Sequence, residues 1–343
     1  MPEKVLISGA TGFIAMHTVE RLLAAGHPVV GTVRNPDAAE KVAPLRAMDG
    51  ADPLLTLVAA DLNDPDPFTA HADVDVIFHM ASPFATDMPD PQRDLVDPAV
   101  NGTLAMMRAA AANPRVRRVV LTSSMAAIMD EPDDEVKTEA VWNTRSTLRR
   151  NPYYLAKMRG EQVAWAFMQA ENPAFDLVVL NPFIVIGPSH TAVLNPSNGI
   201  LAQIINGSFP GVLDLAWGFV DVRTVADAHI EAMRRPDAEG RHILTANPMS
   251  MADVCAIIED LGYGAKMPKR NLTGGLATAL IKLASYTQPK GVGSYMRTHL
   301  GRSPKIDNSK SQRALGIRYS EPRETIRDAL EDMARWGHID AAE

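Results

Sequence analysis

The chain has 343 residues, of which 46% are hydrophobic, and its formal net charge is −7. This hydrophobic fraction excludes a disordered chain, and the acidic balance argues against a surface for nucleic acid or an anionic membrane, because phosphate groups are bound by clustered Lys and Arg. The length suits one catalytic unit made of a large domain and a smaller lobe.

No targeting or membrane segment is expected. The first apolar stretch begins at Val5 without a basic region before it, and no apolar run reaches the roughly 18 residues that a membrane span needs. We therefore predict a cytoplasmic protein without a membrane partner. The apolar stretch Gly274–Ser285 predicts a buried helix or a lid, and the single cysteine, Cys255, predicts ordinary core packing. We predict no metal site.

Short β-branched runs alternate with helical patterns over the first half of the chain. The runs are apolar throughout, as in parallel strands that helices cover on both faces. The predicted strands are Lys4–Ser8, Val29–Val33, Leu54–Ala59, Val74–His79, Arg118–Thr122 and Leu177–Leu180, and the predicted helices are Thr11–Ala25, Asp97–Ala112 and Tyr153–Glu171. This alternation predicts an α/β fold with a doubly wound parallel (Rossmann) sheet.

The pattern changes after Pro182. Prolines and glycines interrupt the next thirty or so residues, whereas Phe219–Arg234 and His242–Ala246 indicate a return to the main domain. We predict that residues 1–182 plus about 215–246 form the Rossmann domain. Residues from about 183–214 plus 247–343 then form a smaller, mostly helical substrate lobe.

A glycine-containing turn follows the first predicted strand and opens the first helix. Gly9 permits the tight turn, and Gly12 lets the backbone approach a pyrophosphate that meets the N–H groups of the helix N-terminus. Thr11, Phe13 and Ile14 belong to the same predicted cofactor site. The alternative is a plain glycine turn, and the strand before it and the helix after it favour dinucleotide binding.

The end of the second predicted strand distinguishes NAD from NADP. An acidic residue at this place would bind the ribose 2′-hydroxyl, but the chain has Arg34, whose planar cation suits a 2′-phosphate, and Lys41 adds a second charge. A surface arginine without a role is the alternative. Asp61 and Leu62 end the third strand, where we expect adenine, although Asp61 also suits a helix cap.

Small residues follow the fourth predicted strand. Met80, Ala81 and Ser82 would let a cofactor lie against the backbone, and Ser82 is also a candidate substrate contact. We interpret His79, at the end of the strand, as a packed and hydrogen-bonded core residue.

Tyr153 and Lys157 lie four residues apart on one helix and therefore share a face. A nearby ammonium, together with the positive nicotinamide of the oxidised cofactor, favours the phenolate, so we expect these charges to lower the pKa of Tyr153 and to make it an acid–base catalyst. Tyr154 is three residues from Lys157, and geometry alone does not exclude it. A tyrosine pair beside a solvated lysine is the alternative.

Thr122, Ser123 and Ser124 end the fifth predicted strand, at the carboxyl edge where open α/β sheets place their sites. A serine hydroxyl there donates a hydrogen bond to a carbonyl oxygen, although serines at strand ends are also common caps.

These motifs, in this order, resemble the extended short-chain dehydrogenases/reductases. The resemblance rests on Gly9-x-x-Gly12, Arg34, Asp61-Leu62, His79–Pro83, Asn101-Gly102-Thr103, Thr122–Ser124, Tyr153-x-x-x-Lys157, Asn181-Pro182 and Phe219–Arg223. Within that family the chain is most similar to the branch of dihydroflavonol 4-reductase, cinnamoyl-CoA reductase and microbial aldehyde and ketone reductases.

The resemblance implies a role for each residue of the site. Tyr153 is then the general acid in reduction, Lys157 binds the nicotinamide ribose, and Ser124, rather than Ser123, orients the carbonyl. Cofactor contacts are further implied for Thr122, Asn101, Pro182, Ile184 and Val185; for Asn101, a buried helix asparagine is the alternative. Members of the family occur as monomers and homodimers, and either state is expected here.

The resemblance thus implies an NADPH-dependent reductase of an aldehyde or ketone carbonyl, with reversible alcohol oxidation. Ser82, Phe84, Ser124 and Met125 are the predicted substrate contacts. Met125, Phe84 and the stretches Ile184–Leu194 and Gly199–Trp217 indicate a mainly apolar pocket for an apolar or aromatic small molecule rather than a flavonoid. The alternatives are a nucleotide-sugar epimerase or dehydratase of the same fold and a non-catalytic NADP-sensing protein.

Overall fold

The computed structural model describes residues 2–64, 66–83, 89–264 and 266–342. Phe84, one of the predicted substrate contacts, lies outside the described residues.

Seven strands form the central sheet, in the order β12-β7-β5-β4-β1-β2-β3, and all neighbours pair in parallel. They are β1 Val5–Ser8, β2 Val29–Val33, β3 Leu55–Ala59, β4 Val76–His79, β5 Arg118–Thr122, β7 Asp176–Pro182 and β12 Gly240–Leu244. The predicted doubly wound sheet is confirmed. The strand order reverses between β1 and β4, where open α/β sheets bind their ligands.

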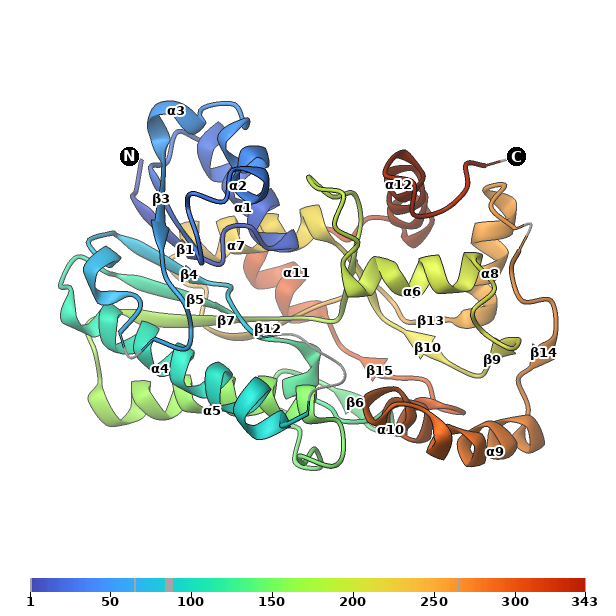
Figure 1. Ribbon diagram of the computed structural model, residues 1–343. Helices are drawn as coiled ribbons and strands as arrows, with labels where there is room; N and C mark the ends of the chain where they lie inside the picture. Colours follow the sequence, from blue (N-terminus) through green and yellow to red (C-terminus); the bar gives the residue numbers. More distant parts are fainter. Residues whose placement is uncertain (1, 65, 84–88, 265, 343) are drawn as a thin grey trace.

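Helices cover both faces of this sheet (Figure 1). On one face α4 (Asp97–Ala112) packs against α5 (Pro152–Glu171), and on the other α1 (Phe13–Ala24) packs against α7 (Val222–Arg234). Successive residues of β1 belong to opposite cores: Val5 and Ile7 join the cluster beneath α1 and α7, whereas Leu6 joins the cluster beneath α4 and α5. This two-sided burial explains why the strands are apolar throughout.

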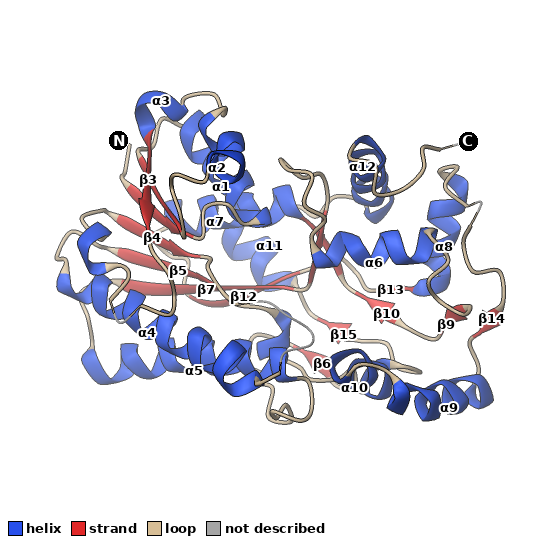
Figure 2. Ribbon diagram, in the orientation of Figure 1, coloured by secondary structure: helices blue, strands red, loops and turns tan. Residues whose placement is uncertain are grey.

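The other elements lie around the sheet and in a second lobe. Two short helices follow β2, α2 (Ala39–Arg46) and α3 (Ala51–Leu54). Besides α7, the helices of the second half of the chain are α6 (Pro196–Ile205), α8 (Met251–Asp260), α9 (Gly275–Ala284), α10 (Lys290–His299), α11 (Ser309–Leu315) and α12 (Pro322–Arg335). The short strands pair in twos: β8 (Ile184–Ile186) with β11 (Phe219–Asp221), β9 (Val212–Leu213) with β14 (Asn271–Leu272), β10 (Ala216–Trp217) with β13 (Met249–Ser250), and β6 (Val136–Lys137) with β15 (Lys305–Ile306). Figure 2 labels the last three pairs.

The division into two domains stays a prediction, and two segments depart from it. Within the predicted return segment, β11 pairs with β8 instead of joining the central sheet. Within the predicted lobe, α11 packs against β12 and α7, and Leu315 and Ile317 belong to the core beneath α1 and α7.

The prediction of burial for Gly274–Ser285 is wrong. The helix forms as α9, but Leu276, Leu280 and Leu283 are 79%, 58% and 69% exposed, because α9 packs on α10 and the turn after it at the outer edge of the lobe. Cys255 is buried in the lobe core and unpaired, as predicted. Among the described helices, none combines the length and the apolar character that crossing a bilayer requires.

Candidate active site

The turn between β1 and α1 forms one wall of the site. Gly9 has a φ of +69°, and a Cβ at this position would lie 3.2 Å from Ala81. Gly12 is the N-cap residue of α1 and provides no capping side chain, so the first N–H groups of the helix are left for other acceptors. The backbone can therefore approach an anion here as the sequence predicts.

Ser8 holds this wall to the loop after β4. Its hydroxyl oxygen accepts hydrogen bonds from the backbone N–H groups of Met80 and Ala81, each at 2.9 Å. The same oxygen is hydrogen-bonded to Nδ1 of His79, 2.9 Å away. His79 is 3% exposed, and burial, together with the charge of Lys157, lowers its pKa to about 3. His79 is thus the packed, hydrogen-bonded residue that was predicted.

The two serines after β5 differ in what they contact. Ser123 is buried, and its hydroxyl donates to the carboxylate of Glu161. Ser124 is only partly buried, and its side chain accepts from the backbone N–H of Ala126 and is hydrogen-bonded to Tyr153. The structure therefore directs the hydroxyl of Ser124 toward Tyr153 and that of Ser123 into the protein.

Helix α5 places Tyr153 and Lys157 together on the wall of the same cleft. Tyr154 does not line this cleft; its ring instead meets His299 edge to face, with 6.0 Å between the ring centroids. The geometry that the sequence left open thus favours Tyr153.

The lowered pKa of Tyr153 was expected from two positive charges, and it is not seen with Lys157 alone. Burial raises the pKa of Tyr153 to about 12, and the hydrogen bond from Ser124 opposes this only in part. Burial also lowers the pKa of Lys157 to about 8, while the negative charge of Glu161 opposes that shift. For both groups, loss of hydration is the largest cause of the shift. Tyr153 is protonated at neutral pH, the form that can give a proton.

Glu161 lies behind the site and was missed by the sequence analysis. It is 1% exposed, pairs with Arg241, and accepts hydrogen bonds from Ser123 and from Nδ2 of Asn181. Its position continues the spacing of Tyr153 and Lys157 along α5, a signal that would have found it. Arg241 also donates to the carbonyl of Val141, so this network joins α5, β7, β12 and the loop after β5.

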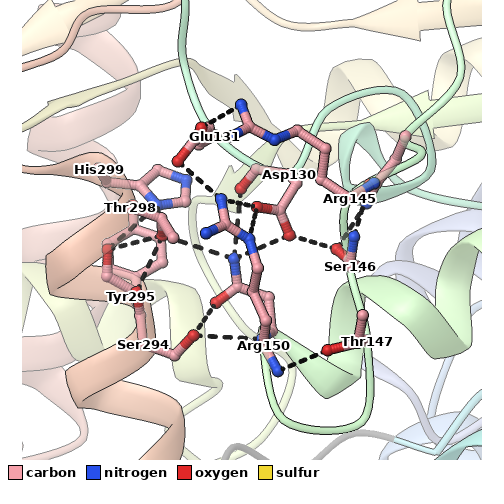
Figure 3. Close-up of polar contacts among 12 residues, drawn as sticks. Asp130, Glu131, Arg145, Ser146, Thr147, Arg150, Ser294, Tyr295, Thr298 and His299 are labelled. Carbon is pink, nitrogen blue, oxygen red and sulfur yellow. Dashed lines mark hydrogen bonds and ion pairs between the residues drawn. The ribbon is translucent and has the colours of Figure 1, made fainter.

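A second polar cluster anchors the beginning of α5 (Figure 3). Arg150 donates to the carboxylates of Asp130 and Glu131, each at 2.7 Å. Asn151, the N-cap residue of α5, has a φ of 50° and exchanges hydrogen bonds with Ser294 of α10. The lobe thereby helps to place Tyr153, two residues further along the helix.

These walls line a cleft with a cavity volume of about 260 Å³. Of the predicted residues, it is lined by Gly9, Gly12, Phe13, Ile14, Met80, Ser82, Thr122, Ser124, Tyr153, Lys157, Pro182 and Val185. It is also lined by residues to which no role was assigned: Ala15, Pro83, Ser123, Phe183, Asn195, Pro196 and Ser197. The last three come from the N-terminus of α6, so both lobes contribute to the cleft.

The other predicted cofactor residues lie outside the lining of this cleft. Arg34 is exposed directly after β2, Lys41 is exposed on α2, and Thr11 is exposed in the glycine turn. Ile184 packs against the lobe core, and Ala81 lies beside Gly9.

Asp61 and Leu62 occupy the loop after β3. The Asp61 carboxylate accepts hydrogen bonds from the backbone and side-chain N–H groups of Asn63 and closes a local turn. No described helix begins there, so the alternative of a helix cap is wrong. Leu62 packs over Gly102, where a Cβ would lie 2.5 Å from the leucine side chain.

Two predictions are corrected by burial. Asn101 is exposed on α4, so the alternative of a buried asparagine is wrong; nor does it line the cleft. Met125 is 1% exposed and packs with Ile128, Met129 and Ile243, because the turn after Ser124 directs it into the core. This placement argues against a contact between Met125 and a substrate.

Comparison with known families decides the relationship. Residues 5–246 match the NAD dependent epimerase/dehydratase family. The chain belongs to this family. The resemblance to extended short-chain dehydrogenases/reductases is thereby confirmed.

Relatives in this family include several reductases. The chain is 37% identical to cinnamoyl-CoA reductase CAD2 of Medicago truncatula over 275 residues, which are 78% of this chain and 83% of the relative. It is 32% identical to the putative NADPH-dependent methylglyoxal reductase GRP2 of Candida albicans over 95% of this chain and 97% of the relative.

The fold is shared with solved reductases of the same branch. The structure of yeast methylglyoxal/isovaleraldehyde reductase Gre2, complexed with NADPH, superimposes with a TM-score of 0.81 at 28% identity and covers 98% of this chain and 100% of the yeast chain.

Proposed function

We propose that this protein is an NADPH-dependent reductase of an aldehyde or ketone carbonyl, with alcohol oxidation as the reverse reaction. One observation carries the proposal: Ser124 and Tyr153 are hydrogen-bonded to each other in a cleft that also contains Lys157 and the glycine turn. The relatives support it, since one is named an NADPH-dependent reductase and another was solved with NADPH.

The residues of the site fit a dinucleotide. A side chain at Gly9 would press on Ala81, and Gly12 leaves the N-terminus of α1 uncapped, so a pyrophosphate can lie against the backbone. Arg34 and Lys41 would bind a 2′-phosphate, and Asp61 and Leu62 would border the adenine. NADPH, when bound, supplies the hydride.

The protein contributes the proton and the polarisation of the carbonyl. Tyr153 is protonated at neutral pH and donates its proton to the carbonyl oxygen, while Ser124 donates a hydrogen bond to the same oxygen as its negative charge grows. Lys157, with a pKa of about 8, carries an ammonium that stabilises the phenolate left behind.

The substrate is proposed to be apolar or aromatic. The apolar side chains that line the cleft are Phe13, Ile14, Met80, Pro182, Phe183 and Val185. Ser82 and Ser124 are the polar residues proposed to contact it, and both line the cleft.

The test is NADPH oxidation over a panel of aromatic and aliphatic aldehydes, ketones and diketones, with NADH as the control. Replacing Tyr153 with Phe should lower turnover at least ~100-fold, because the proton donor is removed, and should leave NADPH binding nearly unchanged. If Tyr153→Phe keeps half of the wild-type rate, the role of Tyr153 is wrong. Purified protein that retains bound NAD, and that does not oxidise NADPH in the presence of any carbonyl compound of the panel, would indicate an epimerase or dehydratase. NADPH binding without any turnover would indicate a sensing protein.

A further inference from the structure

Three metal-ligating side chains meet outside the cleft. His17 and Glu20 are three residues apart on α1, and His190 comes from the loop after β8. Oε2 of Glu20 is 3.9 Å from Nδ1 of His17 and 3.5 Å from Nε2 of His190, and the candidate ligand atoms all lie within 4.8 Å of one another.

The hydrogen bonding of His17 determines which of its nitrogens is available. Nε2 lies 2.9 Å from the carbonyl oxygen of Pro188, and because a carbonyl only accepts, Nε2 must carry the proton. With that proton on Nε2, the neutral ring presents the lone pair of Nδ1. A histidine fixed in this way by a backbone carbonyl is the usual arrangement of a metal ligand.

Both available nitrogens are buried without a hydrogen bond. His17 is only 5% exposed, and its Nδ1 has no hydrogen-bond partner among the described residues; the same holds for Nε2 of His190, whose approach to Glu20 is not a hydrogen bond. Unsatisfied buried polar atoms destabilise a protein, and two that lie against one carboxylate point to a shared ligand.

We propose that His17, Glu20 and His190 bind one divalent transition-metal ion, with zinc preferred. Two imidazoles and one carboxylate are typical zinc ligands, whereas Mg²⁺ and Ca²⁺ prefer oxygen alone. Metal–ligand bonds of about 2.0–2.2 Å place tetrahedral ligands roughly 3.4 Å apart. The 3.5 and 3.9 Å from Glu20 to the two histidines are close to this spacing, and the two imidazole nitrogens lie within 4.8 Å of each other. Water would complete the coordination.

Arg21, the cation beside the cluster, makes its hydrogen bonds to groups other than the Glu20 carboxylate. NH1 of Arg21 is 3.9 Å from Glu20, but the guanidinium is held by the carboxylate of Asp227 and by the backbone oxygen of His17. Glu20 is about half exposed, so the cluster can be reached from solvent.

A metal ion here would join the two parts of the molecule that form the cleft. The glycine turn before α1 lines one side of the cleft, and the loop that carries His190 leads into Asn195 and α6 on the other. The same loop is tied to α12 by a hydrogen bond from the N–H of Ser189 to Asp332. The ion would therefore be structural, holding α1 against the lobe, and this inference is independent of the proposed reaction.

Zinc binding to the full-length chain, stripped of metal by a chelator, tests the proposal. Calorimetry should show one Zn²⁺ per chain, Co²⁺ should give the visible spectrum of a four-coordinate ion, and the melting temperature should rise with zinc. His190→Gln and Glu20→Gln should each weaken zinc binding at least ~tenfold.

His71→Gln and Glu171→Gln remove the same side-chain types elsewhere and should bind zinc as the wild type does. The melting temperature without zinc shows whether each variant is folded. Binding below one equivalent, or His190→Gln and Glu20→Gln variants with wild-type affinity, would overturn the site.

Discussion

Two groups of polar side chains lie on either side of the strand ends and differ in how they are paired. Behind the cleft, Glu161 and Arg241 are buried and their hydrogen bonds are completed within the protein. In front, Ser124, Tyr153 and Lys157 line the cleft and are only partly buried. Neighbouring polar residues can thus have different roles. The buried pair Glu161 and Arg241 holds the sheet to α5, whereas the residues that line the cleft can form hydrogen bonds with a ligand.

Breaking the buried ion pair between Glu161 and Arg241 should have the largest effect on stability. Arg241→Met leaves the Glu161 carboxylate buried without its counterion, so the free energy of unfolding should fall by about 3–5 kcal/mol. Urea denaturation measures this loss. Adding Glu161→Leu should recover part of it, because both charges are then absent; a double variant no more stable than Arg241→Met would contradict the explanation.

The two serines provide a matched pair of variants. Ser124→Ala should lower turnover by about 10²–10³-fold, since it removes a donor to the developing alkoxide, with little change in stability. Ser123→Ala should lower the free energy of unfolding by about 1–3 kcal/mol, because Glu161 loses a buried donor, and should largely retain turnover. Steady-state kinetics and urea denaturation on both variants separate the two roles. Equal losses of turnover would contradict the assignment of a catalytic role to Ser124 and a structural role to Ser123.

The pH dependence of stability sharpens the comparison at Lys157. Its pKa falls from 10.5 to about 8 on folding, so between these values the unfolded chain binds more protons, and raising the pH through this window favours the folded state. Lys157→Met should therefore be more stable than the wild type at pH 7, by at most about 3 kcal/mol, and this advantage should shrink toward pH 10. Unfolding at both pH values, without cofactor, measures it. An advantage that does not change with pH would argue against the lowered pKa.

Arg34 should have the smallest effect of these variants, because it is exposed. Arg34→Ala should raise the Kd of NADPH about 10–100-fold through the loss of a charge-assisted hydrogen bond, and should leave NADH binding nearly unchanged. Fluorescence titration with both cofactors measures this. An equal loss for both would show that Arg34 does not contact the 2′-phosphate.

Much of the sheet and part of the site were predictable from local patterns. β2, β5 and α4 begin and end where predicted, and the ends of the other strands moved by one or two residues, because strand ends depend on the pairing of neighbours. The glycine turn, Ser124, Tyr153 and Lys157 line one cleft, since all follow from the rule that parallel strands present their carboxyl ends at one edge.

The remainder depended on burial and on contacts between distant residues. The partners of Glu161 lie on three other elements, the inward turn of Met125 depends on the core around it, and the exposed face of α9 depends on what the lobe leaves uncovered.

By itself, the sequence determined the alternation of strands and helices, the position of the glycine turn and the spacing of Tyr153 and Lys157, because periodicity and turn chemistry are local properties of the chain. Only the tertiary structure decided that Met125 turns into the core, that Ser123 and Ser124 face different partners and that His17 meets His190, because burial and the proximity of distant residues exist only after the chain has folded.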